Sequence, residues 1–243
     1  MVARVRSAAR KNTPARRVRD ARHATGRAAT PERRAAARTR SGASSRNAGS
    51  RHAEPGLNPR KHRTTTALVL IDLINTWQMD HGERLRRNTL AQLERLAQLK
   101  RRATQAGAPV IFVNDNFGQW RSDFEQVMER ARAMSEEGAR IVDALCPGTG
   151  DYFVLKPRHS GFFSTPLQLL LQELKVKTIV LCGVAGDQCV LATAGDALVR
   201  KFEVVIPRDG IVCVDARRTA AALQHFRRSM EIPTPLSSRV RWR

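Results

Sequence analysis

The feature that most constrains this sequence is a series of short, continuous apolar runs that alternate with longer amphipathic segments. Continuous apolar runs are typical of strands that are covered on both faces; here they are residues 67–72, 109–115, 151–156, 178–184 and 203–207. Between them, apolar residues recur every three or four positions and predict helices. These are residues 85–106, 123–145 with a break at 135–138, 164–175 with Ser164 or Thr165 as the cap, 187–201 and 215–229, followed by a weak strand near 231–233.

Strands that alternate with helices require crossover connections, and these produce a parallel sheet with helices on both faces. The predicted fold class is α/β: a three-layer α/β/α arrangement with a mainly parallel, roughly six-stranded, doubly wound sheet. It occupies residues 64–243, which is enough chain for one domain with a full core.

The charge of the chain is concentrated in its first quarter. The formal charge is +21, of which residues 1–63 carry +15 (18 Lys and Arg against 3 Asp and Glu) and residues 64–243 carry +6 (25 against 19). The first segment has almost no large apolar residues, so we expect a disordered Arg/Ala-rich leader. Three origins remain open: translation of DNA upstream of the true start, a natural tail or organellar transit peptide, and an arm that binds nucleic acid.

Other classes are excluded by simple patterns. No run of about 18 apolar residues exists, which argues against a transmembrane helix, and no short apolar region follows the N-terminal charges as it does in a secretory signal. Four Cys without a CxxC pair argue against a disulfide scaffold or a zinc finger. We therefore expect a reduced, cytoplasmic protein, or an organellar one if the leader is a transit peptide.

Three reactive side chains follow predicted strands, at the edge of a parallel sheet where sites form. Asp72 ends the first strand, Lys156 ends the third, and Cys189 lies in the first turn of the helix after the fourth. Each also has a structural interpretation: a turn cap, a solvated strand end and a small buried residue. A helix N-terminus stabilises a thiolate, so this position is expected to lower the pKa of Cys189.

The segments ALVLIDLINTW, VLKPRHSGFFSTPLQLLL and TIVLCGVAGDQCVLATAGDALVRKFEVVIPRDGI resemble the isochorismatase-like cysteine hydrolase superfamily, which includes nicotinamidases and N-carbamoylsarcosine amidohydrolases. The resemblance covers essentially all of residues 64–243. It implies a catalytic Asp–Lys–Cys triad at the matching positions Asp72, Lys156 and Cys189.

The resemblance also implies a mechanism. Asp72 acts as the general base toward Cys189, Lys156 favours the charged forms of both, and the thiolate attacks an amide or ureido carbonyl to give a thioester. A cis peptide bond maps to Val184–Ala185, and the backbone N–H groups of Ala185 and Cys189 would form the oxyanion hole.

Two departures from the family pattern bear on which substrates are expected. Gly186 stands where relatives usually carry Thr, so a contact made by that threonine side chain is not carried over to this chain. The segment 113–124 contains no His, which disfavours a metal-dependent nicotinamidase, so we expect no metal and no cofactor. Because isochorismate-cleaving relatives lack the nucleophilic Cys, the presence of Cys189 disfavours that reaction. The remaining expectation is hydrolysis of a C–N bond in a small amide or ureido compound. We also expect the protein to form a homo-oligomer.

Weaker candidates surround these positions. We expect five residues to line the substrate pocket: Trp77, Asn116, Phe117, Trp120 and Phe162. His159 is a candidate base for the thiol and Arg158 a candidate carboxylate ligand, although a loop or surface role is favoured for both. The alternatives to an enzyme are a non-catalytic binding or scaffold protein on the same fold, and a redox-active thiol protein that would need Cys182 as its resolving residue.

Overall fold

The computed structural model describes residues 62–145 and 147–243. The expected disordered leader falls almost wholly on residues 1–61, which lie outside the described residues.

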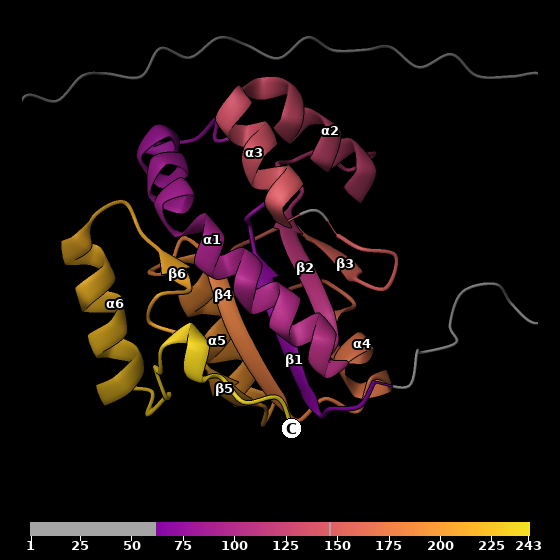
Figure 1. Cartoon of the computed structure of the whole chain (residues 1–243), viewed down its shortest axis with the longest axis vertical. Helices are drawn as coiled ribbons and strands as arrows, with labels where there is room; N and C mark the ends of the chain where they lie inside the picture. Colours follow the sequence, from indigo (N-terminus) through magenta and orange to yellow (C-terminus); the bar gives the residue numbers. More distant parts are fainter. Residues whose placement is uncertain (1–61, 146) are drawn as a thin grey trace, which may run out of the picture. The chain divides into compact units, whose positions relative to one another are not determined.

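Within the described residues the sheet has six strands, all parallel, in the order β3-β2-β1-β4-β5, with β6 paired to the end of β4 (Figure 1). Their bounds are β1 Thr66–Ile71, β2 Val110–Asp115, β3 Tyr152–Lys156, β4 Thr178–Val184, β5 Glu203–Val205 and β6 Ile211–Val212. The chain winds outward from β1 to β3, then returns to the other side of β1 for β4. This confirms the predicted fold class and places the switch point between β1 and β4.

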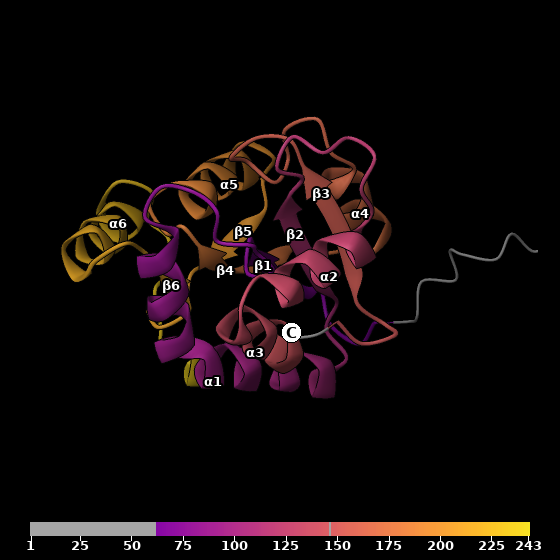
Figure 2. The ribbon, with the colours of Figure 1, turned by 90° about the horizontal axis from the view of Figure 1, so that it is seen from above.

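Helices cover both faces of the sheet (Figure 2). Three pack on one face: α1 Gly82–Ala106, α2 Phe124–Met134 and α3 Glu136–Leu145. Three pack on the other: α4 Leu167–Glu173, α5 Cys189–Val199 and α6 Ala216–Arg228. A short 3-10 helix, Ser237–Arg239, follows α6.

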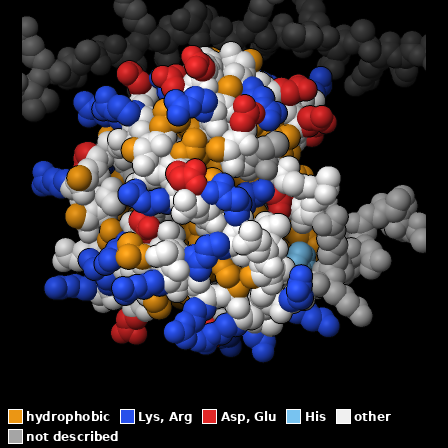
Figure 3. Space-filling view, in the orientation of Figure 1, with side chains coloured by type: hydrophobic (Ala, Val, Ile, Leu, Met, Phe, Trp, Pro, Cys, Tyr) orange, Lys and Arg blue, Asp and Glu red, His pale blue; other side chains and the backbone are white. Residues whose placement is uncertain are grey.

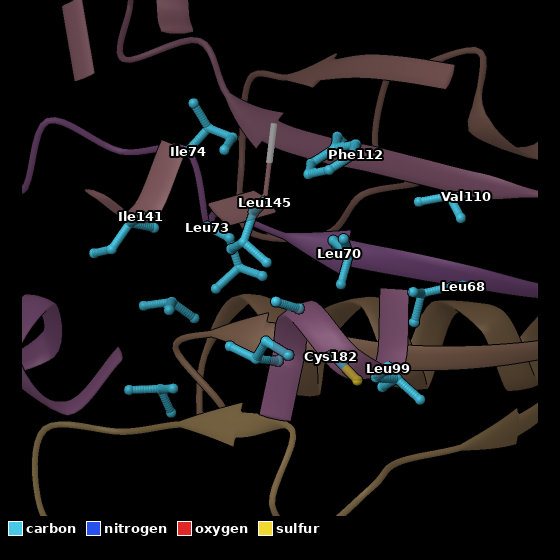
Figure 4. Close-up of a cluster of buried hydrophobic side chains, with 14 of the residues drawn as sticks. Leu68, Leu70, Leu73, Ile74, Leu99, Val110, Phe112, Ile141, Leu145 and Cys182 are labelled. Atoms are coloured by element: carbon cyan, nitrogen blue, oxygen red, sulfur yellow. The ribbon is translucent and has the colours of Figure 1, made fainter. Parts of the chain in front are cut away.

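The two faces of the central strand explain why its sequence is apolar throughout. Leu68 and Leu70 point to the α1 side, where they join Leu99 and Phe112 (Figure 4). Val69 and the other odd-numbered residues of β1 belong to the cluster on the opposite side. Successive side chains of a strand point to opposite faces, so a strand with a helix layer on each side has no polar face.

Helix ends agree with the sequence in most places. α1 ends at Gly107, which adopts φ 74°, and Ser135 is extended and separates α2 from α3 as predicted. The predicted start of α4 is wrong. That helix begins at Leu167 after Pro166, and Ser164, with φ 53°, does not cap it. Thr165 donates its hydroxyl to Gly161 O, and its Oγ1 atom also accepts from Leu167 N at 3.3 Å, so its side chain does bind the first N–H of the helix.

The predicted strand near 231–233 is also wrong. Pro233 O accepts from Ile206 N and Pro235 O from Arg208 N, but prolines have no N–H to return and no ladder forms. The sixth strand is instead β6, which consists of only two residues and has no recognisable pattern of its own.

The end of the chain lies against the start of β1. Arg243 O accepts from Thr65 N at 2.5 Å and Thr66 N at 3.1 Å. Arg102 donates to the carbonyls of Ser237 and Val240. These bonds hold the last residues along the amino edge of the sheet and along α1.

The surface over α1 carries Lys and Arg with acidic groups among them (Figure 3). Within the residues that the structure describes, no helix combines the length and the apolar character needed to cross a bilayer.

Candidate active site

Lys156 is the buried centre of the charged cluster at the carboxyl edge of the sheet. Its Nζ atom lies 2.8 Å from Asp72 Oδ2 and 3.4 Å from Asp115 Oδ2, and it donates to Arg158 O at 3.2 Å. The other oxygen of Asp72 accepts from Asp115 N at 2.7 Å. The ammonium group is therefore surrounded by acceptors, which is the condition under which a charged side chain can be buried.

Cys189 meets this cluster as the first residue of α5. Its Sγ atom accepts from Lys156 Nζ at 3.5 Å, and the carboxylate of Asp72 lies close enough to raise the pKa of its thiol. The imidazole Nδ1 of His159 lies 3.5 Å from the same sulfur. The three residues singled out from the strand ends thus lie together, and His159 is a fourth.

Strand register explains the convergence. Asp115 and Lys156 are partners in the β2–β3 ladder, and Ile71 pairs with Gly183 in the β1–β4 ladder. A Cβ at Gly183 would lie 2.0 Å from Ile71 O, so the close approach of β4 to β1 requires glycine there. The residues that follow each strand are consequently delivered to one edge.

The pKa of Cys189 runs against the sequence-based expectation. Burial, together with the carboxylate of Asp72, raises the pKa of its thiol to about 12, although Lys156 opposes the shift. Burial likewise raises the pKa of Asp72 despite the nearby ammonium ion. Burial lowers the pKa of Lys156, but the negative groups around it outweigh burial and leave it raised. The resting thiol is therefore protonated at neutral pH, and the helix N-terminus does not overcome burial.

The turn after β4 leads directly to the nucleophile. The Val184–Ala185 peptide bond is cis. In the described part of the chain, the N–H groups of Ala185 and Cys189 have no hydrogen-bond acceptor, whereas Ala185 O accepts from Gln188 and Val190. Two free donors beside a nucleophile are what an oxyanion hole requires.

Gly186 has its own packing reason. A Cβ at this position would lie 2.9 Å from Cys213 Sγ and 3.0 Å from Ile211 Cδ1. The space that a larger side chain would occupy is filled by these two residues, so the glycine in this chain is matched to its neighbours in and after β6.

A pocket of about 420 Å³ opens above Asp72 and Cys189. Residues that sequence reasoning missed form much of its wall, among them Met79, His81, Leu85, Gln188, Val214 and Arg218. Arg218 comes from the first turn of α6 and is held by an ion pair with Asp187. No short-range pattern in the sequence signals that α6 reaches this pocket.

The five residues predicted to line the substrate pocket lie elsewhere. Trp77 and Phe162 are buried in the two hydrophobic clusters. Asn116 and Phe117 line a separate pocket of about 350 Å³, and Trp120 is 77% exposed. None of them lines the pocket that contains Cys189, because aromatic residues in the loops pack into or over the helix layer beneath them.

Among residues 62–145 and 147–243, no group of three His, Cys, Asp or Glu side chains is arranged to hold a metal ion. Asp115, the carboxylate that ends β2, is engaged with Lys156 instead.

A model of the isochorismatase domain matches residues 66–237. The chain belongs to the isochorismatase family of hydrolases. YaaI of Bacillus subtilis (strain 168), an uncharacterized isochorismatase family protein, is 38% identical over 145 residues, which are 60% of this chain and 79% of that protein. The ureidoacrylate amidohydrolase RutB of a Methylorubrum extorquens strain is 29% identical over 181 residues, 64% of this chain and 71% of its own.

Solved structures of this family have the same fold. N-carbamoylsarcosine amidase from Thermoplasma acidophilum superposes with a TM-score of 0.54 at 25% identity, over 72% of this chain and 98% of that one. The nicotinamidase SaPncA from Staphylococcus aureus gives 0.54 at 20% identity, over 71% and 99%.

Proposed function

We propose that this family member is a cysteine-dependent hydrolase that cleaves a C–N bond of a small amide or ureido compound through a thioester. The observation that carries the proposal is the contact of Cys189 Sγ with Lys156 Nζ at 3.5 Å, where the same ammonium ion is held by Asp72 at 2.8 Å. Asp72 and Cys189 line a pocket large enough for a small molecule.

The raised pKa of Cys189 indicates which proton is transferred first. Since the pKa of Cys189 is raised to about 12, a base must take its proton as the sulfur attacks. Asp72, whose carboxylate lies close enough to raise the pKa of the thiol, is that base. It then passes the proton to the departing nitrogen, and the N–H groups of Ala185 and Cys189 stabilise the oxyanion between the two steps.

Lys156 stays paired with a negative group during this transfer. When the proton moves from sulfur to Asp72, one anionic partner disappears and another appears within reach of the same ammonium ion. Its raised pKa keeps it charged throughout. Lys156 thereby lowers the cost of forming a buried thiolate.

The names of two relatives guide the choice of substrate. RutB is a ureidoacrylate amidohydrolase and the T. acidophilum protein is an N-carbamoylsarcosine amidase, so both act on ureido compounds. We propose the same bond class for this chain, without a metal or cofactor. The cytoplasmic location and the homo-oligomer stay predictions. Nucleic-acid binding through residues 1–63 stays an alternative, and we expect it only as non-specific binding.

The alternatives outside enzyme catalysis have less support. A scaffold needs no buried ion pair beside a thiol, because such a pair is costly to desolvate. A redox-active protein needs a resolving thiol, but Cys182 is fully buried in β4 and belongs to the α1-side cluster, opposite to the side on which Cys189 packs.

The test is ammonia release from a panel of small amides and ureido acids. We expect turnover of at least one ureido compound, loss to background in Cys189→Ala, and retention in Cys182→Ala, which removes a thiol of β4 that does not line the pocket. Equal activity in the Cys189→Ala variant would overturn the proposed nucleophile.

A further inference from the structure

His159 is the group near the nucleophile that the proposed mechanism leaves without a role. It follows β3 in the loop after Lys156, and its Nδ1 atom lies 3.5 Å from Cys189 Sγ. The residue is exposed, whereas Lys156 is fully buried and Asp72 is 4% exposed. The sulfur therefore has a buried, charged side and a solvent side that carries an imidazole.

The second half of a thioester mechanism needs a base on the solvent side. Water must reach the acyl carbon and lose a proton as it attacks. Asp72, the base of the first step, lies on the buried side of the sulfur, where one of its oxygens contacts Lys156 Nζ at 2.8 Å and the other accepts from Asp115 N at 2.7 Å. The imidazole of His159 is open to water and touches the sulfur that must leave.

We propose that His159 is the acid–base residue of deacylation, an inference that rests on the proposed thioester. Its imidazole takes a proton from the attacking water, and the hydroxide adds to the thioester carbonyl carbon. The C–S bond then breaks, the sulfur leaves with the bonding pair, and the imidazolium returns the proton to it. The sum is acyl-thioester plus water giving carboxylic acid plus the Cys189 thiol.

The contact between His159 Nδ1 and Cys189 Sγ explains how the proton returns to the sulfur. A neutral thiol is the resting form of Cys189, because its pKa is raised. A proton that stayed on the imidazole would leave a buried thiolate, which this environment disfavours. The charged groups that face the sulfur from the sheet edge are Lys156, Asp72 and, through Lys156, Asp115. Arg158 precedes the histidine, and its carbonyl binds Lys156.

The test uses p-nitrophenyl acetate as the acylating probe, because release of p-nitrophenolate separates the two half-reactions. We compare the native chain with His159→Ala and His159→Gln, and with His225→Gln, which alters an exposed histidine of α6 away from the pocket. In the His159 variants we expect a normal burst, a steady rate lowered about 100-fold, and acetylated Cys189 in the intact-mass spectrum.

Two further readouts separate a chemical role from a structural one. Free imidazole is expected to restore the steady rate of His159→Ala, because the position is open to solvent. His159→Gln keeps a side chain that can hydrogen-bond but not one that can take a proton from water, so its steady rate should stay as low as that of His159→Ala. His225→Gln should behave like the native chain in every assay.

Three outcomes count against the proposal in different ways. A native steady rate in both His159 variants overturns the role of His159 and leaves the nucleophile intact. A lowered burst with no accumulated acetyl-enzyme assigns His159 to acylation and overturns deacylation as its step. Absence of acetyl-Cys189 from all variants, with an equal burst in Cys189→Ala, overturns the thioester itself and this inference with it.

Discussion

Strand β3 has a lysine–aspartate ion pair at each end, and the two pairs have nearly the same geometry. At its start, Asp151 is paired with Lys100 of α1 at 2.8 Å; at its finish, Lys156 is paired with Asp72 at 2.8 Å. All four side chains are largely buried, at 14% and 8% exposure for the first pair and 0% and 6% for the second. Each pair borders a pocket of about 400 Å³.

The surroundings of the two pairs differ. At the amino edge, Lys100 lies over the ring of Phe112 at 5.7 Å, and the pocket is lined largely by glycines, threonines and basic side chains. At the carboxyl edge, the ammonium ion also meets Asp115 and the thiol of Cys189. A buried ion pair alone fastens two elements together; it becomes a candidate site when a nucleophile and free backbone donors are added.

The largest expected effect comes from removing each ammonium ion. Lys156→Met and Lys100→Met should each lower the free energy of unfolding by about 3 kcal/mol, because each leaves a buried carboxylate without its partner. Only Lys156→Met should lower hydrolysis, by about 1,000-fold. Urea unfolding and ammonia release under conditions where both variants are folded measure the two effects. Equal losses of activity would break the distinction between the two ends of β3.

The acidity of Cys189 gives the next effect. Because its pKa lies near 12, the rate of alkylation by iodoacetamide should rise about tenfold per pH unit between about pH 7 and 9, without a plateau. Lys156 lowers that pKa, so Lys156→Met should slow alkylation further, whereas Lys100→Met should not change it. Labelling of Cys189 is followed by peptide mass spectrometry. A plateau near neutral pH would indicate a stabilised thiolate and contradict the effect of burial.

A smaller effect is expected at the wall behind the carboxyl edge. Gly186→Thr should lower the free energy of unfolding by about 2 kcal/mol, because the added atoms meet Cys213 and Ile211. Gly195→Ala, inside α5, is the matched control: its Cβ would meet Met230 at 3.9 Å, an ordinary contact, and the helix should gain up to about 1 kcal/mol. Thermal unfolding measures both changes. An unchanged thermal stability of Gly186→Thr would show that Cys213 and Ile211 move aside more easily than their packing indicates.

The smallest effect is expected from removing metal ions. The cations at both ends of β3 are lysines, so exhaustive EDTA treatment should leave ammonia release and thermal stability unchanged. The same preparation should lose its activity to iodoacetamide. Activity lost to EDTA and restored by zinc or manganese would contradict both the expected metal independence and the assignment of Lys156 as the positive charge of the site.

Much of this arrangement could be predicted because parallel strands deliver their carboxyl ends to one edge. Asp72 and Cys189 follow β1 and β4, Lys156 ends β3, and continuous apolar runs in the sequence indicate all three strands. The same reasoning failed for the pocket wall. Arg218 reaches it through the docking of α6 after a two-residue strand, and no local pattern encodes that docking.

Two other differences between the sequence-based expectations and the structure also arise from tertiary packing. The acidity of Cys189 depends on how deeply α5 packs, and tertiary burial outweighs the effect of the helix end. Trp77 is an aromatic residue in a loop near the site, but its large apolar surface draws it into the core instead of the pocket. Patterns in sequence indicate which residues leave the sheet at a given edge; they do not indicate which of them turn inward.

The hydrogen bonds from Thr65 and Thr66 to Arg243 have a consequence for chain connectivity. They bring the two ends of the folded unit together at the amino edge of the sheet, away from Cys189. A circular permutant whose short linker joins residue 243 to residue 62 would therefore preserve every strand pairing. New termini can then be opened beside Trp120, so that a reporter fused there lies close to the carboxyl edge while the original ends remain joined.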